Sequence, residues 1–545
     1  MADVLRVVAA QLNFCVGDIS TNCQMICEAA LASAKRGVDC IIFPELALTG
    51  YPPEDLLIRP GLQRRVDLCL DEIAQASQEV TIVVGHPRTT EAGLFNSASV
   101  FASGECIARY DKQALPNYAV FDEKRYFEPG EGPVVTTIGG FQIGLSICED
   151  IWQIETSQAN AKAGAEVIFN INASPYNRGK YEERLTALRA AAQAGGLPIV
   201  YTNIIGGQDE LVFDGSSLAL NADGAVAARA PQFAETLFDL EISRTDTGIS
   251  LHGDSTGEKS ELASIYQALV TGVRDYIDKN RFKGCVLGLS GGIDSALTLA
   301  VAVDAIGAEN VVAVSMPSRY TAQMSIDDAL AQARSEGCQC HVVSIEEPFS
   351  AFTQIIEPVV ADLKAGAAQE NMQARCRGLI LMALSNAEGK IVLATGNKSE
   401  MSVGYATLYG DMAGGFAPLK DIPKMLVYEL ANYRNTISQV IPNRVIERPP
   451  SAELAPDQKD TDSLPPYEIL DPILERYIER DMTPREIANE GFDLETAKRV
   501  AGMVDRNEYK RRQAAPGVKI TRRAFGRDRR FPITSRYSEQ QPVLK

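Results

Sequence analysis

The sequence predicts an α/β protein in two parts, a layered α/β domain followed by a doubly wound parallel-sheet domain. Apolar strands and amphipathic helices alternate along the chain. A polar, Gly-rich stretch interrupts this alternation near the middle, and the strand that opens the second half runs straight into a Gly-rich turn and a helix. At 545 residues the chain is long enough for two domains. We therefore expect domains at residues 1–245 and 262–545, joined by a linker at residues 246–261.

The composition is that of an acidic globular protein. The formal net charge of -18 argues against a general nucleic-acid binder. The eleven cysteines show no repeated Cys-x-x-Cys spacing and the three histidines lie far apart, so we expect no structural zinc site and reduced thiols, as in the cytoplasm. The sequence has no run of about 18 apolar residues, and its first residues read as a strand and not as a signal peptide. We expect no membrane association.

In the first half, apolar runs predict strands and longer amphipathic stretches predict helices. Strands are expected at residues 5–11, 39–43, 80–85, 97–101, 106–110, 141–147, 167–172 and 199–203, and helices at 22–36 and 182–195. This alternation predicts a layered α/β domain.

Three of these strands are followed at once by reactive side chains, namely Glu45, Lys112 and Cys148. Groups placed directly after strands tend to meet at one edge of a sheet. A thiol that attacks an amide needs a base and a cation that stabilises the oxyanion, and these residue types supply both. Taken singly, each has an ordinary explanation, because a cysteine at a strand end is often an inert core residue and Glu or Lys there is usually solvated.

Four segments carry a family resemblance. They are Phe43-Pro44-Glu45, residues 111–118 (Asp-Lys-Gln-Ala-Leu-Pro-Asn-Tyr), residues 122–130 and Ile147-Cys148-Glu149-Asp150. Over about residues 4–245 the chain resembles the nitrilase (carbon–nitrogen hydrolase) superfamily. The resemblance implies an αββα sandwich in which Glu45 is the general base, Lys112 stabilises the tetrahedral intermediate and Cys148 forms a thioester. It also implies a supporting role for Glu123, and glutamine contacts for Tyr118, Ser174 and Lys180.

The second half opens on a candidate phosphate loop. An apolar strand leads into Ser290-Gly291-Gly292-Ile293-Asp294-Ser295, and a helix follows. Glycines let the backbone approach an anion, and the N–H groups of the helix start point at it. The Gly-Lys-Ser/Thr of a Walker A loop is missing, so we expect this loop to hold a pyrophosphate that leaves. A strand–turn–helix crossover with glycine for tight packing is the plainer alternative. The expected ATP-binding residues here are Gly288, Leu289, Ser290, Gly291, Gly292, Ile293, Asp294 and Ser295.

Three further strands complete the expected parallel sheet. They are placed at residues 311–316, 340–344 and 390–394, and the connecting helices at 325–337 and 371–388. The last strand ends at Thr395-Gly396-Asn397-Lys398-Ser399-Glu400. Asp294 and Glu400 would then lie at the same sheet edge, where two carboxylates beside a polyphosphate are suitable ligands for Mg²⁺. The alternative is that Glu400 only caps a helix start.

Three other segments stand out in the second half. Residues 362–369 are small and polar and are expected to be mobile. Residues 442–466 carry six prolines and a charged centre, which favours a lid over substrate. Residues 510–536 are strongly basic but lack interleaved aromatic residues. We expect this basic segment to face a phosphate-rich small substrate or an acidic neighbouring subunit, with a solvated tail as the alternative.

The second half resembles the NAD synthetases, which belong to the ATP pyrophosphatase group. The further matching segments are residues 371–377, 394–400, 404–405, 410–411, 418–421, 450–454 and 462–467. The resemblance implies that Thr395 contacts ATP, that Asn371, Glu400 and Lys510 contact deamido-NAD, and that Asp294 and Glu400 hold Mg²⁺. Together the two halves resemble the glutamine-dependent NAD synthetases. That family implies amidation of deamido-NAD with ATP and glutamine, transfer of ammonia through a tunnel, and a homo-oligomer.

Other classes share single features of the chain. Asparagine synthetases share the phosphate loop but need an N-terminal nucleophilic cysteine, and here Ala2 follows Met1. GMP synthetases use an unrelated glutaminase domain. A nitrilase-type amidase with a regulatory nucleotide-binding domain would hydrolyse its amide without ATP. A nucleic-acid binder would rest on the basic segment alone.

Overall fold

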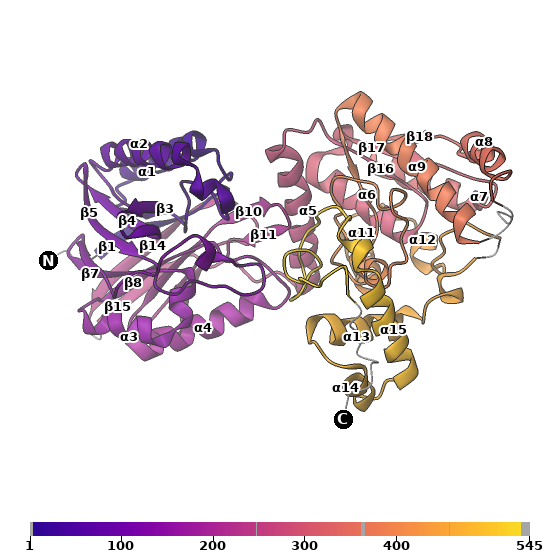
Figure 1. Cartoon of the computed structure of the whole chain (residues 1–545). Coiled ribbons are helices and arrows are strands. Elements are labelled where there is room, and N and C mark those ends of the chain that lie inside the picture. The colour runs from indigo at the N-terminus through magenta and orange to yellow at the C-terminus, as the bar shows by residue number, and fades with distance from the viewer. Residues whose placement is uncertain (1–3, 247, 361–365, 457, 536–545) are drawn as a thin grey trace. The chain divides into compact units, whose positions relative to one another are not determined.

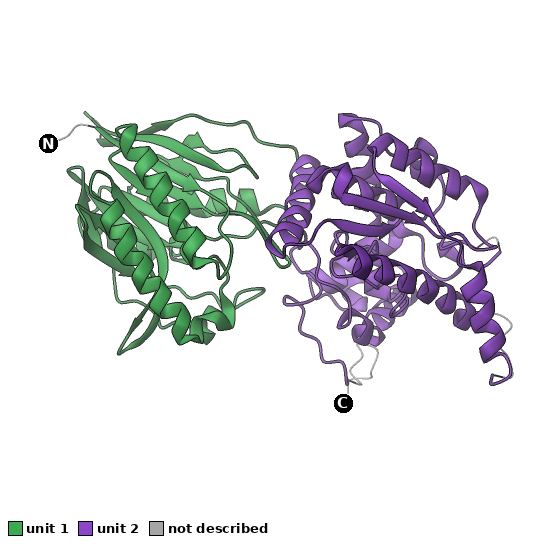
Figure 2. Cartoon of the chain, turned by 90° about the horizontal axis from the view of Figure 1, so that it is seen from above, with its two compact units in different colours: residues 1–260 green, residues 261–545 purple. Residues whose placement is uncertain are grey.

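The computed structural model describes residues 4–246, 248–360, 366–456 and 458–535. The chain forms two compact units, Met1–Ser260 and Glu261–Lys545 (Figure 2). In the described parts of the chain, no helix combines the length and the apolar character that crossing a bilayer needs.

Unit 1 contains two large β-sheets. The first has the strand order β15-β14-β1-β2-β3-β4-β5 and the second the order β13-β12-β9-β8-β7-β6. The strands of the first are β1 (Val4–Gln11), β2 (Cys40–Ile42), β3 (Thr81–Thr90), β4 (Gly93–Ala102), β5 (Glu105–Asp111), β14 (Thr236–Thr245) and β15 (Gly248–Gly253). Those of the second are β6 (Val135–Ile138), β7 (Phe141–Ile147), β8 (Val167–Asn172), β9 (Ile199–Asn203), β12 (Leu218–Leu220) and β13 (Val226–Arg229). A hairpin of β10 (Ile205–Gln208) and β11 (Leu211–Asp214) stands apart from both.

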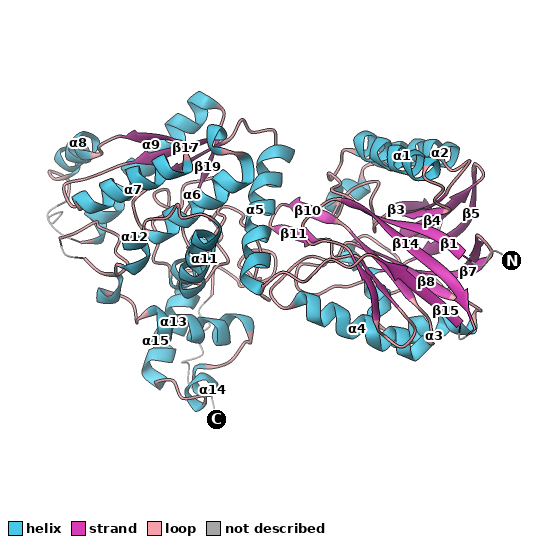
Figure 3. Ribbon diagram, turned by 180° about the vertical axis from the view of Figure 1, so that it is seen from behind, coloured by secondary structure: helices cyan, strands magenta, loops and turns pink. Residues whose placement is uncertain are grey.

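The two sheets of unit 1 form the middle layers of a four-layer sandwich. Helices α1 (Ile19–Lys35) and α2 (Pro60–Ala76) cover the first sheet, and α3 (Ile154–Lys162) and α4 (Lys180–Gly195) cover the second (Figure 3). One apolar core lies between the sheets and further cores lie under each helix pair. This is the αββα sandwich that the resemblance implied, and it confirms the predicted fold class for this half.

Strand β15 lies inside the stretch expected to be a linker. It pairs with β14 as an edge strand of the first sheet. The burial of β15 explains why a linker was expected here, because Leu251 is the one buried residue of this strand. An edge strand is held largely by backbone hydrogen bonds on one side, so one inward apolar side chain is enough to place it. The sequence of β15 therefore lacks the alternating apolar pattern that predicts a strand.

Unit 2 is built on a parallel sheet with the order β18-β17-β16-β19 (Figure 1). The strands are β16 (Cys285–Gly288), β17 (Val311–Ser315), β18 (Gln339–Val342) and β19 (Ile391–Leu393). Helices α5 (Glu261–Lys279), α6 (Ile293–Ile306), α7 (Gln323–Glu336) and α11 (Lys424–Ile437) pack with one another on one face. Helices α8 (Glu346–Ile356) and α9 (Ala367–Glu388) share an apolar core with the other face. The strand order reverses between β16 and β19, which confirms the doubly wound sheet and places its switch point there.

A helical region follows the sheet. It comprises α10 (Lys398–Val403), α12 (Asn443–Glu447), α13 (Tyr467–Leu474), α14 (Pro484–Asn489), α15 (Leu494–Arg506) and α16 (Glu508–Arg511). A π-helical turn, Glu475–Glu479, extends α13. Apolar side chains of α13, α14 and α15 form their own core, which includes Val403 of α10. Of the small polar stretch expected to be mobile (362–369), residues 362–365 lie outside the described residues, and α9 begins at Ala367, within the rest of it.

Part of the basic segment is buried, whereas Arg512, Arg522 and Arg530 are exposed. Arg511 and Arg529 both bind the carboxylate of Glu508, at 2.9 and 3.2 Å, and all three side chains are buried. Lys519 lies 3.0 Å from Asp528. For these residues the expectation of an external acidic or phosphate-rich partner was wrong. The acidic residues that pair with these side chains, Glu508 and Asp528, lie next to and within the segment. They are few, so the composition of the segment showed only its excess of basic residues.

Candidate active sites

Cys148 occupies a tight elbow at the end of β7. It is 5% exposed and begins the 3-10 turn Cys148–Trp152 with φ of 44°, a conformation that costs energy for a non-glycine residue. The buried carboxylate of Asp150 holds this turn in place. It accepts hydrogen bonds from Ile147 N at 2.9 Å, Tyr110 Oη at 2.7 Å and Ala114 N at 2.7 Å. The turn that carries Cys148 is thereby tied to the segment that carries Lys112.

Lys112 is buried between two carboxylates. Its Nζ lies 2.6 Å from Glu45 Oε1 and 2.8 Å from Glu123 Oε2. Burial alone would lower the pKa of Lys112, but the charges of Glu123 and Glu45 hold that pKa above its ordinary value. The structure therefore brings together Glu45, Lys112 and Glu123, which are 67 and 11 residues apart in the chain.

The Glu45 carboxylate is held in one orientation by three donors. Oε1 accepts from Lys112 Nζ and from Asn96 Nδ2 at 2.8 Å, and Oε2 accepts from the backbone N–H of Ala173 at 2.9 Å. The three donors fix the direction in which the carboxylate oxygens point. Asn96 was not among the expected site residues. The feature that could have indicated it is an amide side chain within the buried strand β4.

The thiol of Cys148 is protonated in the resting site. Burial, followed by the Glu45 carboxylate, raises its pKa, whereas Lys112 acts in the opposite direction. Burial also raises the pKa of Glu123 to about 7, while Lys112 and the Tyr51 hydroxyl, 3.0 Å from Glu123, favour its ionised form. A thiol beside an oriented carboxylate and a buried ammonium can attack an amide once the carboxylate takes its proton.

The three expected glutamine contacts have different surroundings. Tyr118 is 55% exposed and its hydroxyl donates to Glu149 at 3.0 Å. Lys180 lies 4.3 Å from the ring centroid of Trp152, and burial lowers its pKa. Ser174 is buried after β8, where its N–H donates to Asn203 at 2.9 Å. Tyr118 and Lys180 thus contact the turn that begins with Cys148, the first through Glu149 and the second through Trp152.

A cavity of about 850 Å³ lies at the switch point of the sheet in unit 2. Its wall includes Thr395, Glu400 and, from the phosphate loop, Gly288, Leu289, Ser290, Gly292, Ile293, Asp294 and Ser295. Val445 and residues 448–455 and 458–460 form another part of the wall. The expected lid therefore borders the same cavity as the loop, and the volume is in the range of small-molecule sites.

The phosphate loop is held by its own serines. Ser295 Oγ accepts from Ser290 N at 3.2 Å and donates to Gly292 O at 3.0 Å. Gly291 has φ of 80°, and a Cβ at that position would lie 2.2 Å from the carbonyl oxygen of Ser325. Glycine is required there by conformation and by space. The N-terminus of α6, with Gly292 as its N-cap, thus lines the cavity, and a helix start of this kind can bind an anion.

Asp294 and Glu400 share one ammonium group. Lys424 Nζ bonds Asp294 Oδ2 and lies 3.6 Å from Glu400 Oε1, and Asn397 Nδ2 donates to Asp294 Oδ1 at 2.8 Å. Burial and the Asp294 charge raise the pKa of Glu400 to about 8. Asp294 and Glu400 are two neighbouring carboxylates that require a compensating positive charge. They are suitable ligands for a divalent metal ion whose other ligands come from phosphate and water. Lys424 carried no signal in the sequence, because it lies 130 residues from Asp294 at an ordinary helix start.

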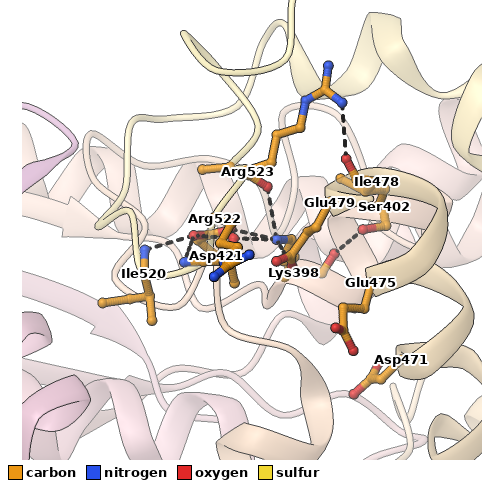
Figure 4. Close-up of polar contacts among 12 residues, drawn as sticks. Lys398, Ser402, Asp421, Asp471, Glu475, Ile478, Glu479, Ile520, Arg522 and Arg523 are labelled. Carbon is orange, nitrogen blue, oxygen red and sulfur yellow. Dashed lines mark hydrogen bonds and ion pairs between the residues drawn. The ribbon is translucent and has the colours of Figure 1, made fainter. Parts of the chain in front are cut away.

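The helix that carries Glu400 is anchored by Lys398 (Figure 4). Lys398 Nζ is buried and donates to Glu479 at 2.8 Å, Thr521 at 2.6 Å and the carbonyl oxygen of Arg523 at 3.1 Å, and it lies 3.0 Å from Asp421. These bonds join α10 to the end of the α13 extension and to the C-terminal segment. The partners come from distant parts of the chain, so the position of Glu400 depends on the whole helical region.

Asn371 and Lys510 hold the segment that follows α10. Thr407 Oγ1 donates to Asn371 Oδ1 at 2.7 Å, and Lys510 Nζ donates to the carbonyl oxygens of Gly404 and Ala406 at 2.7 and 2.9 Å. Tyr405 and Thr407 of this segment line the cavity, whereas Asn371 and Lys510 are not in its described wall. Their direct contact with a dinucleotide stays a prediction. Nowhere in the described ranges do three or more Asp, Glu, His or Cys side chains cluster as a metal site.

The two units match two family models. The model described as carbon–nitrogen hydrolase matches residues 6–248, and the model described as NAD synthase matches residues 265–514. The fold and the site in each unit thus define a protein with an amide-cleaving half and an NAD synthase half.

Full-length relatives narrow this class to one family. The chain is 49% identical over 537 residues to the glutamine-dependent NAD(+) synthetase of Acinetobacter baylyi, covering 97% of this chain and 98% of that protein. It is 47% identical over 547 residues to that of Xanthomonas campestris pv. campestris, covering 99% of each. The chain belongs to the glutamine-dependent NAD(+) synthetase family.

Solved structures agree with this assignment. The structure of the glutamine-dependent NAD+ synthetase from Acinetobacter baumannii in complex with ADP has a TM-score of 0.80 at 45% identity, covering 99% of this chain and all of that one. The glutamine-dependent NAD(+) synthetase from Cytophaga hutchinsonii, with a TM-score of 0.83 at 23% identity over 98% of each chain, shares the fold.

Proposed function

We propose that the chain is a ligase that makes NAD from deamido-NAD, ATP and glutamine, with AMP, pyrophosphate and glutamate as the other products. The observation that carries the proposal is that one chain holds both a buried Glu45–Lys112–Cys148 group and a phosphate-loop cavity of about 850 Å³. The named relatives align over both halves, which disfavours an amidase with a merely regulatory nucleotide-binding domain.

In unit 2 the nicotinate carboxylate of deamido-NAD is activated before it is amidated. A carboxylate is a poor acylating group, so its oxygen attacks the α-phosphate of ATP and forms an acyl-adenylate as pyrophosphate leaves. The N–H groups at the start of α6 face the phosphates, and Thr395 contacts the nucleotide. Asn371, Glu400 and Lys510 act on the deamido-NAD side. Asp294 and Glu400 would hold Mg²⁺, which supplies charge neutralisation to the phosphates.

In unit 1 glutamine is the source of ammonia. Tyr118, Ser174 and Lys180 hold the substrate at the Cys148 turn. Glu45 takes the thiol proton as the sulfur attacks the amide carbon, and the Lys112 ammonium stabilises the oxyanion. Return of that proton to the nitrogen releases ammonia and leaves a thioester. Water, activated by Glu45, then hydrolyses the thioester to glutamate.

Three finer points belong to the same proposal. Ammonia passes from Cys148 to the adenylate without release into the medium, because free ammonia at neutral pH is mostly non-nucleophilic ammonium. The protein is a homo-oligomer, and exposed apolar side chains on α8 and α9 support this: Phe352 is 43%, Ile355 64% and Leu379 62% exposed. The scattered free cysteines favour the cytoplasm. The glutamine-cleaving and NAD-forming functions divide between the two compact units, residues 1–260 and 261–545, and β15 belongs to the first.

The test is NAD formation from deamido-NAD and ATP, with either glutamine or ammonium as nitrogen donor. Wild type should use both, and C148A should use ammonium only. Loss of both activities in a folded C148A protein would contradict the division of labour. ATP-independent amide hydrolysis without any NAD formation would favour the amidase. If an added ammonia-scavenging enzyme abolished glutamine-driven synthesis, direct transfer of ammonia would be wrong.

A further inference from the structure

A guanidinium group from a distant part of the chain lies against the phosphate loop. Arg448 directly follows α12, and its Nη2 donates to the carbonyl oxygen of Gly291 at 2.5 Å. Its Nη1 donates to Ser325 Oγ at 2.8 Å. The side chain is 21% exposed and lines the cavity together with Ser290 and Gly292. A positive charge therefore stands in the cavity wall beside the loop, although the loop itself contains no lysine or arginine.

The other cations in the described wall have different neighbours. Lys424 bonds Asp294 and is close to Glu400, and Arg377 donates to the carbonyl oxygen of Met316 at 3.0 Å. Lys459, in the wall segment 458–460, is exposed. The carboxylate paired with Arg448 is that of Glu453, at 3.9 Å, which is the weak end of an ion pair. Glu453 is held instead by Ser325 Oγ at 2.6 Å. The charge of Arg448 is thus only weakly compensated within the protein and lies where phosphate is expected.

We propose that Arg448 binds the β-phosphate of ATP and stabilises the pyrophosphate leaving group, in place of the lysine that the loop lacks. This inference rests on the proposed function and deepens it. When the carboxylate attacks the α-phosphorus, the bond from that phosphorus to the α,β-bridging oxygen breaks. The bridging oxygen leaves with the electron pair, so negative charge grows on the pyrophosphate. A guanidinium is planar and can donate to two phosphate oxygens at once.

Arg448 also affects the loop through its backbone. Its bond to the Gly291 carbonyl fixes the peptide plane whose N–H belongs to Gly292, the N-cap of α6. That N–H group donates to Ser290 Oγ at 3.2 Å, inside the loop. One side chain therefore supplies charge to the leaving group and holds the loop in its conformation. Because Arg448 belongs to residues 442–466, it makes the expected lid part of the phosphate site.

The test is the affinity of the full-length protein for inorganic pyrophosphate with Mg²⁺, measured by calorimetry and as product inhibition of ammonium-driven NAD synthesis. Loss of a partly buried charged partner should weaken pyrophosphate binding in R448Q by about ten- to a hundredfold. R448K keeps the charge without the planar fork and should fall between R448Q and wild type. R444Q is the matched control, because Arg444 is 54% exposed and paired with Asp328, and it should bind as wild type does.

A second variant separates the charge of Arg448 from its structural hydrogen bond to Ser325. S325A removes the hydroxyl that Nη1 contacts but keeps the guanidinium, so its pyrophosphate affinity should stay within about threefold of wild type. Unchanged affinity in R448Q would overturn the inference, and so would an equal loss in S325A and R448Q, since Arg448 would then be only a structural latch. Failure of wild type to make NAD from ammonium would instead overturn the proposed function. Thermal unfolding checks that each variant is folded.

Discussion

The Nζ atom of Lys112 lies 2.6 Å from Oε1 of Glu45, and both side chains are fully buried. Neither charge is stable alone in such a place, because an unpaired buried charge costs several kcal/mol. With Glu123 as a third member, the group has two carboxylates and one ammonium. Lys112 therefore supplies the positive charge that both buried carboxylates pair with.

Replacing Lys112 by methionine should abolish most glutamine hydrolysis. Without the ammonium, one of the carboxylates will take up a proton and the oxyanion loses its stabilising charge. We expect a loss of about 10²- to 10⁴-fold in glutamate release. Ammonium-driven NAD synthesis should persist. Lys124→Met, at an exposed lysine next to Glu123, is the matched control and should hydrolyse glutamine normally. Equal loss in both variants would contradict this role of Lys112.

Replacing Gly291 by alanine should disable the phosphate loop. The new Cβ would meet the Ser325 carbonyl oxygen at 2.2 Å in addition to the strain of φ 80°. Gly337→Ala separates the two effects, because Gly337 has φ of 73° with open space around its Cβ position. That control should cost about 1 to 2 kcal/mol of unfolding free energy and keep ammonium-driven synthesis. G291A should lose this synthesis, and a fully active G291A protein would show that the loop has more room.

Stabilisation by MgATP should increase with pH. The pKa of Glu400 is raised to about 8 by burial and by Asp294, so the carboxyl binds a proton in the folded protein that it lacks in the unfolded chain. Its contribution to stability therefore falls as pH rises from about 4.5 to about 8. A metal ion must displace that proton, so the thermal shift caused by MgATP should be larger at pH 8.5 than at pH 6.5.

Glu400→Gln should lose this pH dependence, whereas Glu309→Gln, at an exposed position on the same unit, should keep it. A MgATP shift of the same size at both pH values in wild type would speak against Glu400 as a metal ligand.

Unit 1 should lose stability in mild acid through His86. Burial lowers the pKa of this histidine to about 4, and its ring bonds Ser99 Oγ at 2.7 Å and Pro87 O at 3.0 Å. The unfolded chain binds the proton at a pKa of about 6.5. The stabilising contribution is therefore complete above that pH and is lost as pH falls toward 4, by about 3 kcal/mol in total.

Denaturant unfolding followed by fluorescence measures this effect, because the chain has one tryptophan, Trp152 of unit 1. Replacing His86 by glutamine should flatten the pH dependence between pH 6.5 and 4. His252→Gln, at an exposed site in the same unit, should leave it unchanged. If H86Q kept the wild-type slope, another group would be responsible.

Sequence patterns located most of the fold because both units consist of locally regular elements. Strands β7, β8 and β9 have the bounds expected from their apolar runs. Strand β15 was missed because it buries one residue, and the basic segment was misread because its acidic partners are few. Candidate residues could be found where reactive groups follow strands, as at Glu45 and Lys112. Lys424 could not, because nothing around it in the chain marks it, and Asn96 had only the weak signal of an amide within a buried strand.

The sequence alone determined the two-part α/β architecture and the phosphate loop, because these depend on local periodicity and on residues that are neighbours in the chain. It also placed Cys148, Lys112 and Glu45 at strand ends. Only the tertiary structure decided which charges pair. Lys424 meets Asp294 across 130 residues, and Arg448 meets Gly291 across 157. The physical reason is that the energy of a charge depends on its neighbours in space, which local sequence does not encode.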